Sequence, residues 1–434
     1  MRRAACPRAV ASSRMSRSAN RQPAPTIVFG AFDRHNFGDL LFAHVAQRML
    51  PGRDVHFAGL ADRDLREYGG HRVRAIGLLL ATLKGRAPDL IHAGGELLAC
   101  NAWEAAVMLA PPHDLQATLA SEDAWKQDGR AWAQRRFGVA ALAPYVLSRA
   151  SLGGPGERDL NRVIFNAVGG ADLASRDPAL RAEVLASLQD ANDVSVRDRE
   201  THAVLQAHGI KARLVPDPAV MVAELFGKTI RHRAAGSMLK ALHAAFPHGY
   251  AAVQFSADFG DDATLDTLAR EIDCMARRTG LGVVLFRAGA APWHDDDACY
   301  ERLASRLSAA TSVSVFASLN VWDICALIAK SRVYCGSSLH GRIVAMAFAL
   351  PRVNLQRASA REAITKQTAF ATTWEPEEIA PAAVGIDEMA DGIGHALTAP
   401  ASLLRDTAAD LARRYREGFE PVRLGLGRSD RAFQ

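Results

Sequence analysis

Short apolar runs alternate with amphipathic stretches along the first half of the chain, and several of these runs end at glycine or proline. Strands are predicted for the apolar runs at residues 26–31, 55–59, 73–77, 89–93, 162–168, 193–196 and 211–215. Helices are predicted where apolar residues recur at helical spacing, at residues 40–50, 178–188 and 200–208. This alternation is typical of a parallel sheet that is covered by helices.

A second alternation of the same kind occupies the other half of the chain. Strands are predicted at residues 249–256, 281–286, 312–316, 332–335 and 352–355. Helices are predicted at residues 263–280, 297–309, 321–330, 339–349, 388–397 and 403–416. Between the two halves, the basic stretch at residues 221–240 shows no clear periodicity and is interpreted as a linker.

Two such units in succession predict the α/β class, with two Rossmann-like lobes and a central cleft. The N-terminal lobe is expected at residues 26–220 and the C-terminal lobe at residues 241–400, followed by a helix and tail at residues 401–434. Sites in parallel sheets lie outside the carboxyl ends of the strands. Polar residues that follow the predicted strands are therefore the candidates for function.

The net charge of +5 is concentrated at the N-terminus. Residues 1–25 contain six arginines, no acidic residue and no apolar core of a secretory signal, so they are interpreted as a disordered tail. An organelle transit peptide is the alternative. The remaining residues carry a net charge of −1, which argues against nucleic-acid binding.

No apolar run approaches the roughly 18 residues that a membrane helix requires, so no integral membrane segment is expected.

Neither a metal nor a cofactor is predicted. The six cysteines form no C-x-x-C pair, and we interpret them as reduced thiols, which favours a cytoplasmic protein. His294 and the acidic run at residues 295–297 have no second cluster beside them and are interpreted as a solvated loop rather than a cation site. The sequence has no P-loop, no G-x-S-x-G elbow, no H-E-x-x-H and no dinucleotide fingerprint.

The clearest local signal follows the strand predicted at residues 332–335. Ser338 is a suitable N-cap for the next helix, which places His340 in the first turn, near unsatisfied N–H groups. Such a turn binds phosphate or carboxylate and suits a histidine that transfers protons. Arg342 is close enough to add a second contact to an anion. The alternative is a capped core helix with a buried, satisfied histidine.

A second signal lies between the first strand and the first helix. Asn36, Gly38 and Asp39 stand at the carboxyl end of that strand, where Asp39 can orient or deprotonate a hydroxyl group of a substrate. The alternative is that Asp39 only caps the helix.

Three further strand ends carry weaker signals. Gly94 and Gly95 can cradle an anion with their backbone, although paired glycines often mark only a tight turn. Arg197 can hold an anion across the cleft, or pair with a surface aspartate. Asp217 lies between two prolines and exposes a carboxylate, or forms a hinge between the lobes.

Together these motifs resemble those of the polysaccharide pyruvyl transferase family. The matching elements, in family order over residues 26–356, are N-x-G-D at 36–39, D-h-h-h-x-G-G at 89–95, V-R-D at 196–198, Asp217 and S-x-H-G at 338–341. Each motif is weak alone, and five in order are fairly specific. The resemblance implies a fold like that of the B-type glycosyltransferases.

The resemblance also implies a reaction, in which a pyruvyl group moves from phosphoenolpyruvate to two sugar hydroxyls and forms a ketal. His340 then matches the proton-transferring histidine, Arg197 a donor-anion ligand, and Asp39 a residue that orients the acceptor. The donor is expected on the C-terminal lobe, and a sugar or lipid-linked glycan acceptor on the N-terminal lobe. The Trp-rich segment at residues 101–155 is interpreted as an acceptor-side insertion.

One departure from the family pattern concerns the donor. Many members carry arginine where this chain has Ser338, and that arginine would hold a donor anion. Arg342 is expected to compensate.

Two other functions stay open: a B-type glycosyltransferase that uses a nucleotide sugar, and a non-catalytic relative. The first is disfavoured because no acidic residue lies between Gly341 and Arg361, whereas retaining enzymes of that type often hold the ribose with such a glutamate. Catalysis requires His340, Arg197 and Asp39 to converge on one cleft.

Overall fold

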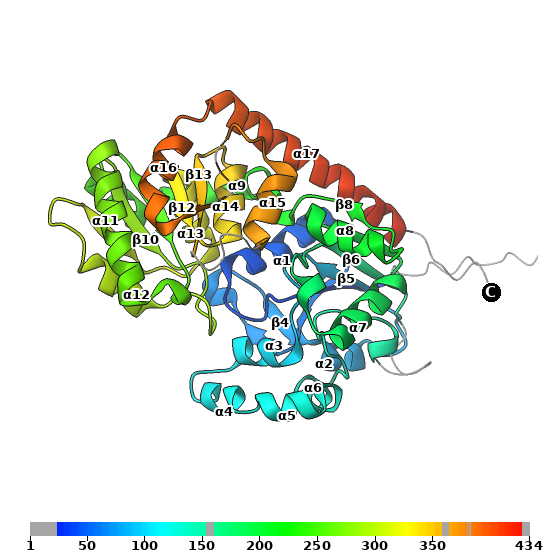
Figure 1. The fold of residues 1–434 in the computed structure, drawn as a ribbon. Helices are drawn as coiled ribbons and strands as arrows, with labels where there is room; N and C mark the ends of the chain where they lie inside the picture. The colour runs from blue at the N-terminus through cyan, green and yellow to red at the C-terminus, as the bar shows by residue number, and fades with distance from the viewer. Residues whose placement is uncertain (1–23, 153–159, 358–363, 380, 382, 428–434) are drawn as a thin grey trace, which may run out of the picture.

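The computed structural model describes residues 24–152, 160–357, 364–379, 381 and 383–427. It consists of two helix-flanked sheets that lie side by side (Figure 1). The first sheet has eight strands in the order β3-β4-β2-β1-β5-β6-β7-β8, all parallel except for the β3–β4 pair. The second has six parallel strands in the order β11-β10-β9-β12-β13-β14. The predicted α/β fold class with two Rossmann-like lobes is therefore confirmed.

The first sheet consists of β1 (Thr26–Phe29), β2 (Val55–Gly59), β3 (Arg63–Asp64), β4 (Arg72–Ala75), β5 (Asp89–Ala93), β6 (Arg162–Val168), β7 (Asp193–Val196) and β8 (Arg213–Leu214). The second consists of β9 (Tyr250–Gln254), β10 (Gly282–Phe286), β11 (Val313–Phe316), β12 (Val333–Gly336), β13 (Arg352–Gln356) and β14 (Ala383–Gly385).

The helices up to the end of the first sheet are α1 (Phe37–Met49), α2 (Ile76–Thr82), α3 (Ala102–Leu109), α4 (Leu115–Leu119), α5 (Glu122–Gln127), α6 (Gly129–Phe137), α7 (Pro178–Gln189) and α8 (Arg199–Ala207). The later helices are α9 (Val222–Ala234), α10 (Ser237–Ala245), α11 (Asp262–Thr279), α12 (Asp297–Ala304), α13 (Val321–Lys330), α14 (Leu339–Ala347), α15 (Lys366–Trp374), α16 (Met389–Leu397) and α17 (Ala401–Leu426). The 3-10 turn η4 (Pro218–Met221) precedes α9.

The stretch between the lobes is helical, so the expectation of a non-periodic linker at residues 221–240 is wrong. It forms α9 and the first part of α10. Phe226, Ile230 and Ala234 are buried at a spacing of four residues, so α9 has one apolar face. The basic residues at 231–233 that hid this pattern are exposed.

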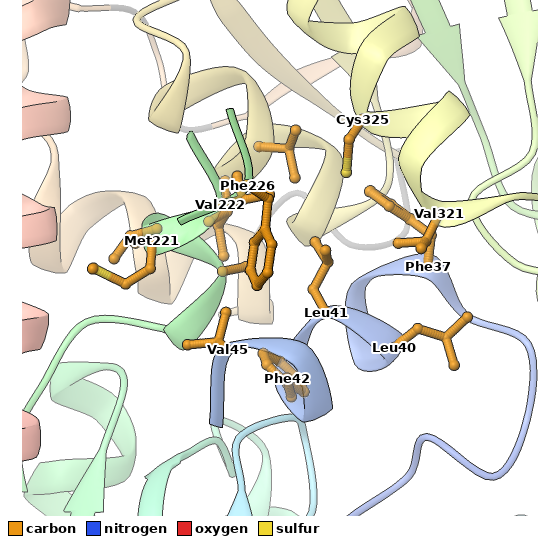
Figure 2. Close-up of a cluster of buried hydrophobic side chains, with 14 of the residues drawn as sticks. Phe37, Leu40, Leu41, Phe42, Val45, Met221, Val222, Phe226, Val321 and Cys325 are labelled. Atoms are coloured by element: carbon orange, nitrogen blue, oxygen red, sulfur yellow. The ribbon is translucent and has the colours of Figure 1, made fainter. Parts of the chain in front are cut away.

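A shared apolar core joins the two lobes. Phe37, Leu41 and Phe42 of α1 pack with side chains of α9 and α13, as Figure 2 shows. Since α1 follows the first strand of the N-terminal lobe and α13 belongs to the C-terminal lobe, this core fixes the lobes against each other. It also places the start of α1 beside α14.

Several elements were not expected from the sequence. The strand predicted at residues 73–77 ends at Ala75, where α2 begins. The segment at residues 101–155 contains α3 to α6, which form a helical layer below the first sheet in Figure 1. Helix α17 extends to Leu426 and packs back against the N-terminal lobe, where the Asn166 side-chain amide donates to the Tyr415 hydroxyl.

None of the helices in the described residues is both long and apolar enough to cross a membrane. Of the cysteines, Cys100, Cys274, Cys299, Cys325 and Cys335 are free thiols. Cys6 and the N-terminal tail expected at residues 1–25 lie outside the described residues, apart from residues 24 and 25.

Candidate active site

A cleft of about 700 Å³ opens between the carboxyl ends of the two sheets. The N-terminal lobe lines it with the loops that follow β1, β5, β6 and β7, and the C-terminal lobe with the loops that follow β9, β10, β12 and β13. Asp39, Arg197 and His340 all line this cleft, so the structure brings these three candidates to one cleft. Asn36 and Ser338 line it as well.

His340 stands in the first turn of α14, at the boundary between the lobes. The Ser338 hydroxyl accepts from the Gly341 backbone N–H and caps this helix, as expected from the sequence. The imidazole is buried and packs edge-on against Phe42, with ring centroids 5.1 Å apart. Its Nε2 atom lies 3.7 Å from the Asp217 carboxylate, which is longer than a hydrogen bond.

Gly38 supports the other side of the same imidazole. A Cβ atom at Gly38 would lie 1.9 Å from Nδ1 of His340, so only glycine leaves room for the ring. Gly38 was predicted to bind substrate, and the structure instead places it against the candidate catalytic side chain. The glycine of the N-x-G-D motif therefore sets the position of a histidine from the opposite lobe.

The substitution Gly38→Ala is expected to displace the His340 ring and to lower turnover at least tenfold, because a methyl group cannot share that space. Gly394→Ala is the matched control, since a Cβ at Gly394 in α16 meets no atom within 4 Å. Steady-state kinetics of both variants test this prediction. Equal turnover in the two variants would show that the ring position does not matter.

Arg197 and Asp217 form a buried ionic chain behind His340. The Arg197 guanidinium donates to the Asp217 carboxylate at 2.9 Å and to the Glu96 carboxylate at 2.5 Å. Burial opposes ionisation of Asp217, but His340 and Arg197 outweigh it and hold the pKa of this carboxyl below its usual range. Asp217 is therefore ionised and faces the histidine.

The ionic chain behind His340 changes the interpretation of three residues. Arg197 was predicted to bind a donor anion, but two carboxylates already occupy its guanidinium. Asp217 was predicted to be an exposed carboxylate, and it is fully buried. Glu96 lines the cleft and was not a candidate, although it directly follows Gly94 and Gly95 in the sequence.

Gly94 and Gly95 form the turn that brings Glu96 to this position. Both have a positive φ, of +77° and +86°, a conformation that side chains rarely adopt. A Cβ on Gly94 would approach the Phe42 ring to 3.1 Å. Neither glycine is among the residues that line the cleft, so the anion cradle expected there is not supported by the structure.

Asn36 and Asp39 lie at the start of α1 and line the cleft. The Asn36 side-chain oxygen accepts from the backbone N–H groups of Gly38 and Asp39, so Asn36, rather than Asp39, is the N-cap. This frees the Asp39 carboxylate for other contacts, and it lies 3.8 Å from the Arg34 guanidinium. Arg34 also donates to the Tyr145 hydroxyl at 2.9 Å.

Arg342 lies away from the cleft, which corrects the expectation that it replaces the missing arginine at position 338. It is fully buried, and its guanidinium donates to both oxygens of Glu375 at 2.9 and 3.0 Å. Arg352 donates to the same carboxylate. Despite its burial, these two guanidinium groups lower the pKa of Glu375 to about 2. Arg342 therefore stabilises the fold of the C-terminal lobe.

Helix α15 supplies a basic group that sequence reasoning missed. Its first residue, Lys366, is exposed and lines the cleft together with Arg357. The Gln367 side chain donates to the Ser337 carbonyl at 2.5 Å and joins α15 to the turn before α14. The N-termini of two helices, α14 and α15, thus meet at one side of the cleft.

The loop that was interpreted as solvated, at residues 294–297, begins inside the cleft. Burial lowers the pKa of His294 to about 4 and raises the pKa of Asp295 to about 7. The Gln254 side chain donates to both oxygens of Asp295, and its own oxygen accepts from the Ser338 N–H. Asp295 and Gln254 thereby hold the start of α14 in place.

The described residues contain no cluster of histidine, cysteine and carboxylate side chains suited to a metal ion.

Comparison with known families addresses the part of the chain that carries most of this site. Residues 156–358 match the family model for polysaccharide pyruvyl transferases. The match includes Arg197, Asp217, Ser338 and His340, and it confirms the resemblance inferred from the sequence motifs. A search of curated proteins finds no significant match.

Solved structures show the same overall fold. UDP-GlcNAc 2-epimerase from Neisseria meningitidis, bound to UDP-GlcNAc, aligns over 92% of this chain and 98% of its own, with 11% identity and a TM-score of 0.50. The S. aureus MnaA–UDP structure aligns over 93% of this chain and 98% of its own, with 11% identity and a TM-score of 0.53. At this identity the likeness concerns the fold alone, which is the expected GT-B-like one.

Proposed function

We propose that the protein is a pyruvyl transferase that uses phosphoenolpyruvate as donor and forms a ketal with two hydroxyls of a sugar in a glycan. The observation that carries this proposal is His340, which lines the cleft between the two lobes and is backed by the ionised Asp217. Both residues lie within the segment that matches the pyruvyl transferase family model. A cytoplasmic location, expected from the reduced cysteines, belongs to the same proposal.

The reaction requires two proton transfers that one histidine can serve. Two sugar oxygens form bonds to C2 of phosphoenolpyruvate, and the bond from C2 to the phosphate oxygen breaks. One hydroxyl proton ends on C3, which becomes a methyl group, and the other leaves with the phosphate. In this scheme His340 holds the proton delivered to C3, and Asp217 stabilises the positive charge on the imidazole.

The donor phosphate fits the side of the cleft where α14 and α15 begin. Helix N-termini present backbone N–H groups and a positive dipole end, which favour phosphate. Lys366, the first residue of α15, adds side-chain charge there, and Arg357 also lines the cleft. This assignment replaces the earlier one, in which Arg197 and Arg342 bind the donor. Asp39, on the N-terminal lobe, is positioned to orient an acceptor hydroxyl.

Phosphoenolpyruvate is expected to raise the melting temperature of the protein. At 100 times its Kd, a ligand adds about 2.7 kcal/mol to the free energy of unfolding. Lys366→Ala is expected to weaken phosphoenolpyruvate about tenfold, or about 1.4 kcal/mol, because a charge-assisted contact to the phosphate is lost. Thermal-shift titrations of both proteins measure this effect.

Lys240→Ala is the control for the change in net charge, since Lys240 is exposed on α10, outside the cleft. A panel of nucleotide sugars is titrated in parallel. A shift with nucleotide sugars alone would replace the proposal by a glycosyltransferase. No shift with either class, in the presence and absence of a sugar acceptor, would favour a non-catalytic relative.

A further inference from the structure

An exposed tryptophan stands at the mouth of the cleft in a strained backbone conformation. Trp293 lies in the loop between β10 and α12, and the residue is 51% exposed. Its φ of +66° is a left-handed conformation that bulky residues rarely adopt and that costs on the order of 1–3 kcal/mol. A folded chain keeps such strain where the position of the side chain has a use.

The loop that carries Trp293 is held firmly from both lobes. The Ala290 N–H donates to Nδ1 of His35 at 3.1 Å, which anchors the loop to the N-terminal lobe. The Ala257 N–H donates to the His294 carbonyl at 2.7 Å, which anchors it to the C-terminal lobe. The backbone on both sides of Trp293 is therefore anchored.

A second tryptophan meets it from the opposite lobe. Trp103 of α3 lies with its ring centroid 5.4 Å from that of Trp293, at an interplanar angle of 59°. Its indole N–H donates to the Thr118 carbonyl at 3.1 Å, so this ring is held in place as well. The pair forms an aromatic corner that includes the segment interpreted as an acceptor-side insertion.

Charged side chains on the N-terminal lobe line the same cleft. Glu104 follows Trp103 in α3, and its carboxylate accepts from the Arg176 guanidinium at 2.7 Å. Arg176 also pairs with Asp172 at 3.0 Å. All three are partly exposed and line the cleft. A cleft that presents both an apolar ring and hydrogen-bonding groups suits a pyranose, which has an apolar C–H face and a polar rim of hydroxyls.

We propose that Trp293, supported by Trp103, is the stacking platform for a pyranose ring of the acceptor glycan. This inference rests on the proposed function and specifies the acceptor side of the same cleft. A lipid chain does not suit a cleft lined by these charged side chains. A nucleobase is the rival occupant, and the experiment below separates it from a sugar.

Saturation-transfer NMR with small sugars tests the platform directly. The probes are methyl β-D-glucoside, methyl β-D-galactoside, cellobiose and lactose, each titrated to about 50 mM, with uridine monophosphate as the nucleobase probe. The ring C–H protons of at least one sugar are expected to receive saturation from the wild-type protein. Trp293→Gly is expected to reduce that signal at least tenfold, and Trp293→Phe is expected to restore part of it.

The glycine variant separates binding from folding. Because glycine adopts a positive φ without strain, Trp293→Gly is expected to melt at the same temperature as the wild type or higher. Met238→Ala removes an exposed apolar side chain on α10 and is expected to leave the sugar signal unchanged.

The outcomes are distinct from those of the donor experiment. A sugar signal that depends on Trp293 supports the platform even if phosphoenolpyruvate gives no thermal shift. The missing thermal shift would overturn only the proposed donor. No sugar signal, or one that survives Trp293→Gly, overturns the platform while a phosphoenolpyruvate shift persists. A signal from uridine monophosphate alone that depends on Trp293 also overturns it, in favour of a nucleobase site.

Discussion

Replacing His340 by asparagine is expected to lower turnover by about 10²- to 10⁴-fold, the usual contribution of a positioned acid or base. The fold should tolerate this change. His340 Nε2 has no hydrogen-bond partner among the described residues, and asparagine fits within the space of the imidazole. The melting temperature is therefore expected to change little. Steady-state kinetics and thermal melts of the same preparation measure both effects.

His395→Asn is the matched control, because His395 is exposed on α16 and away from the cleft. Binding of phosphoenolpyruvate adds a second readout. The His340→Asn variant is expected to retain the thermal shift with the donor while it loses turnover. Full activity in this variant would exclude His340 as the proton-transferring group.

Replacing Arg197 by methionine is expected to destabilise the protein by about 3–5 kcal/mol, since it leaves the fully buried Asp217 carboxylate without its guanidinium partner. Activity should fall as well, because Asp217 then no longer has a fixed orientation toward His340. Denaturant unfolding of the wild type and the variant measures the loss.

A double substitution distinguishes this ionic chain from an anion-binding arginine. The double variant Arg197→Met with Asp217→Asn is expected to lose less free energy of unfolding than the two single variants lose in sum. In the double variant, the charge at position 217 is removed together with its guanidinium partner. Arg278→Met, which breaks an exposed pair with Asp391, is expected to show no measurable change. An Arg197→Met variant of normal stability that only loses affinity for phosphoenolpyruvate would restore the role predicted from the sequence.

Continuous apolar runs predicted the strands well, because central strands of a parallel sheet are buried on both faces. The strands at residues 55–59, 89–93 and 162–168 have the predicted bounds. Helix α9 was missed although Phe226, Ile230 and Ala234 repeat every four residues. Gly227 and the basic residues at 228 and 231–233 interrupt the visible pattern. Helix α15 was missed because its threonines and alanines give only a weak periodic signal.

The site was predictable where one residue carries the signal and unpredictable where the partner is distant in sequence. Ser338 and His340 follow a strand and start a helix, so their place in the cleft could be inferred. Arg342 was misassigned because its partner, Glu375, is 33 residues away and no local pattern connects them. Gly38 was placed in the right motif, but its contact with His340 depends on the packing of two lobes.

The path of α17 has a consequence for how the protein is made. The helix begins beside the C-terminal lobe and ends beside the N-terminal one, near α8 and β8 (Figure 1). Its Tyr415 and Phe419 are buried in the core shared with α1. Gly418 packs so closely that a Cβ there would lie 2.6 Å from Val215. In chain order, α17 follows every strand of the second sheet, so the segment that closes the first lobe is synthesised after that sheet. Until then, the apolar side chains of the N-terminal lobe that pack with Tyr415 and Phe419 lack these partners.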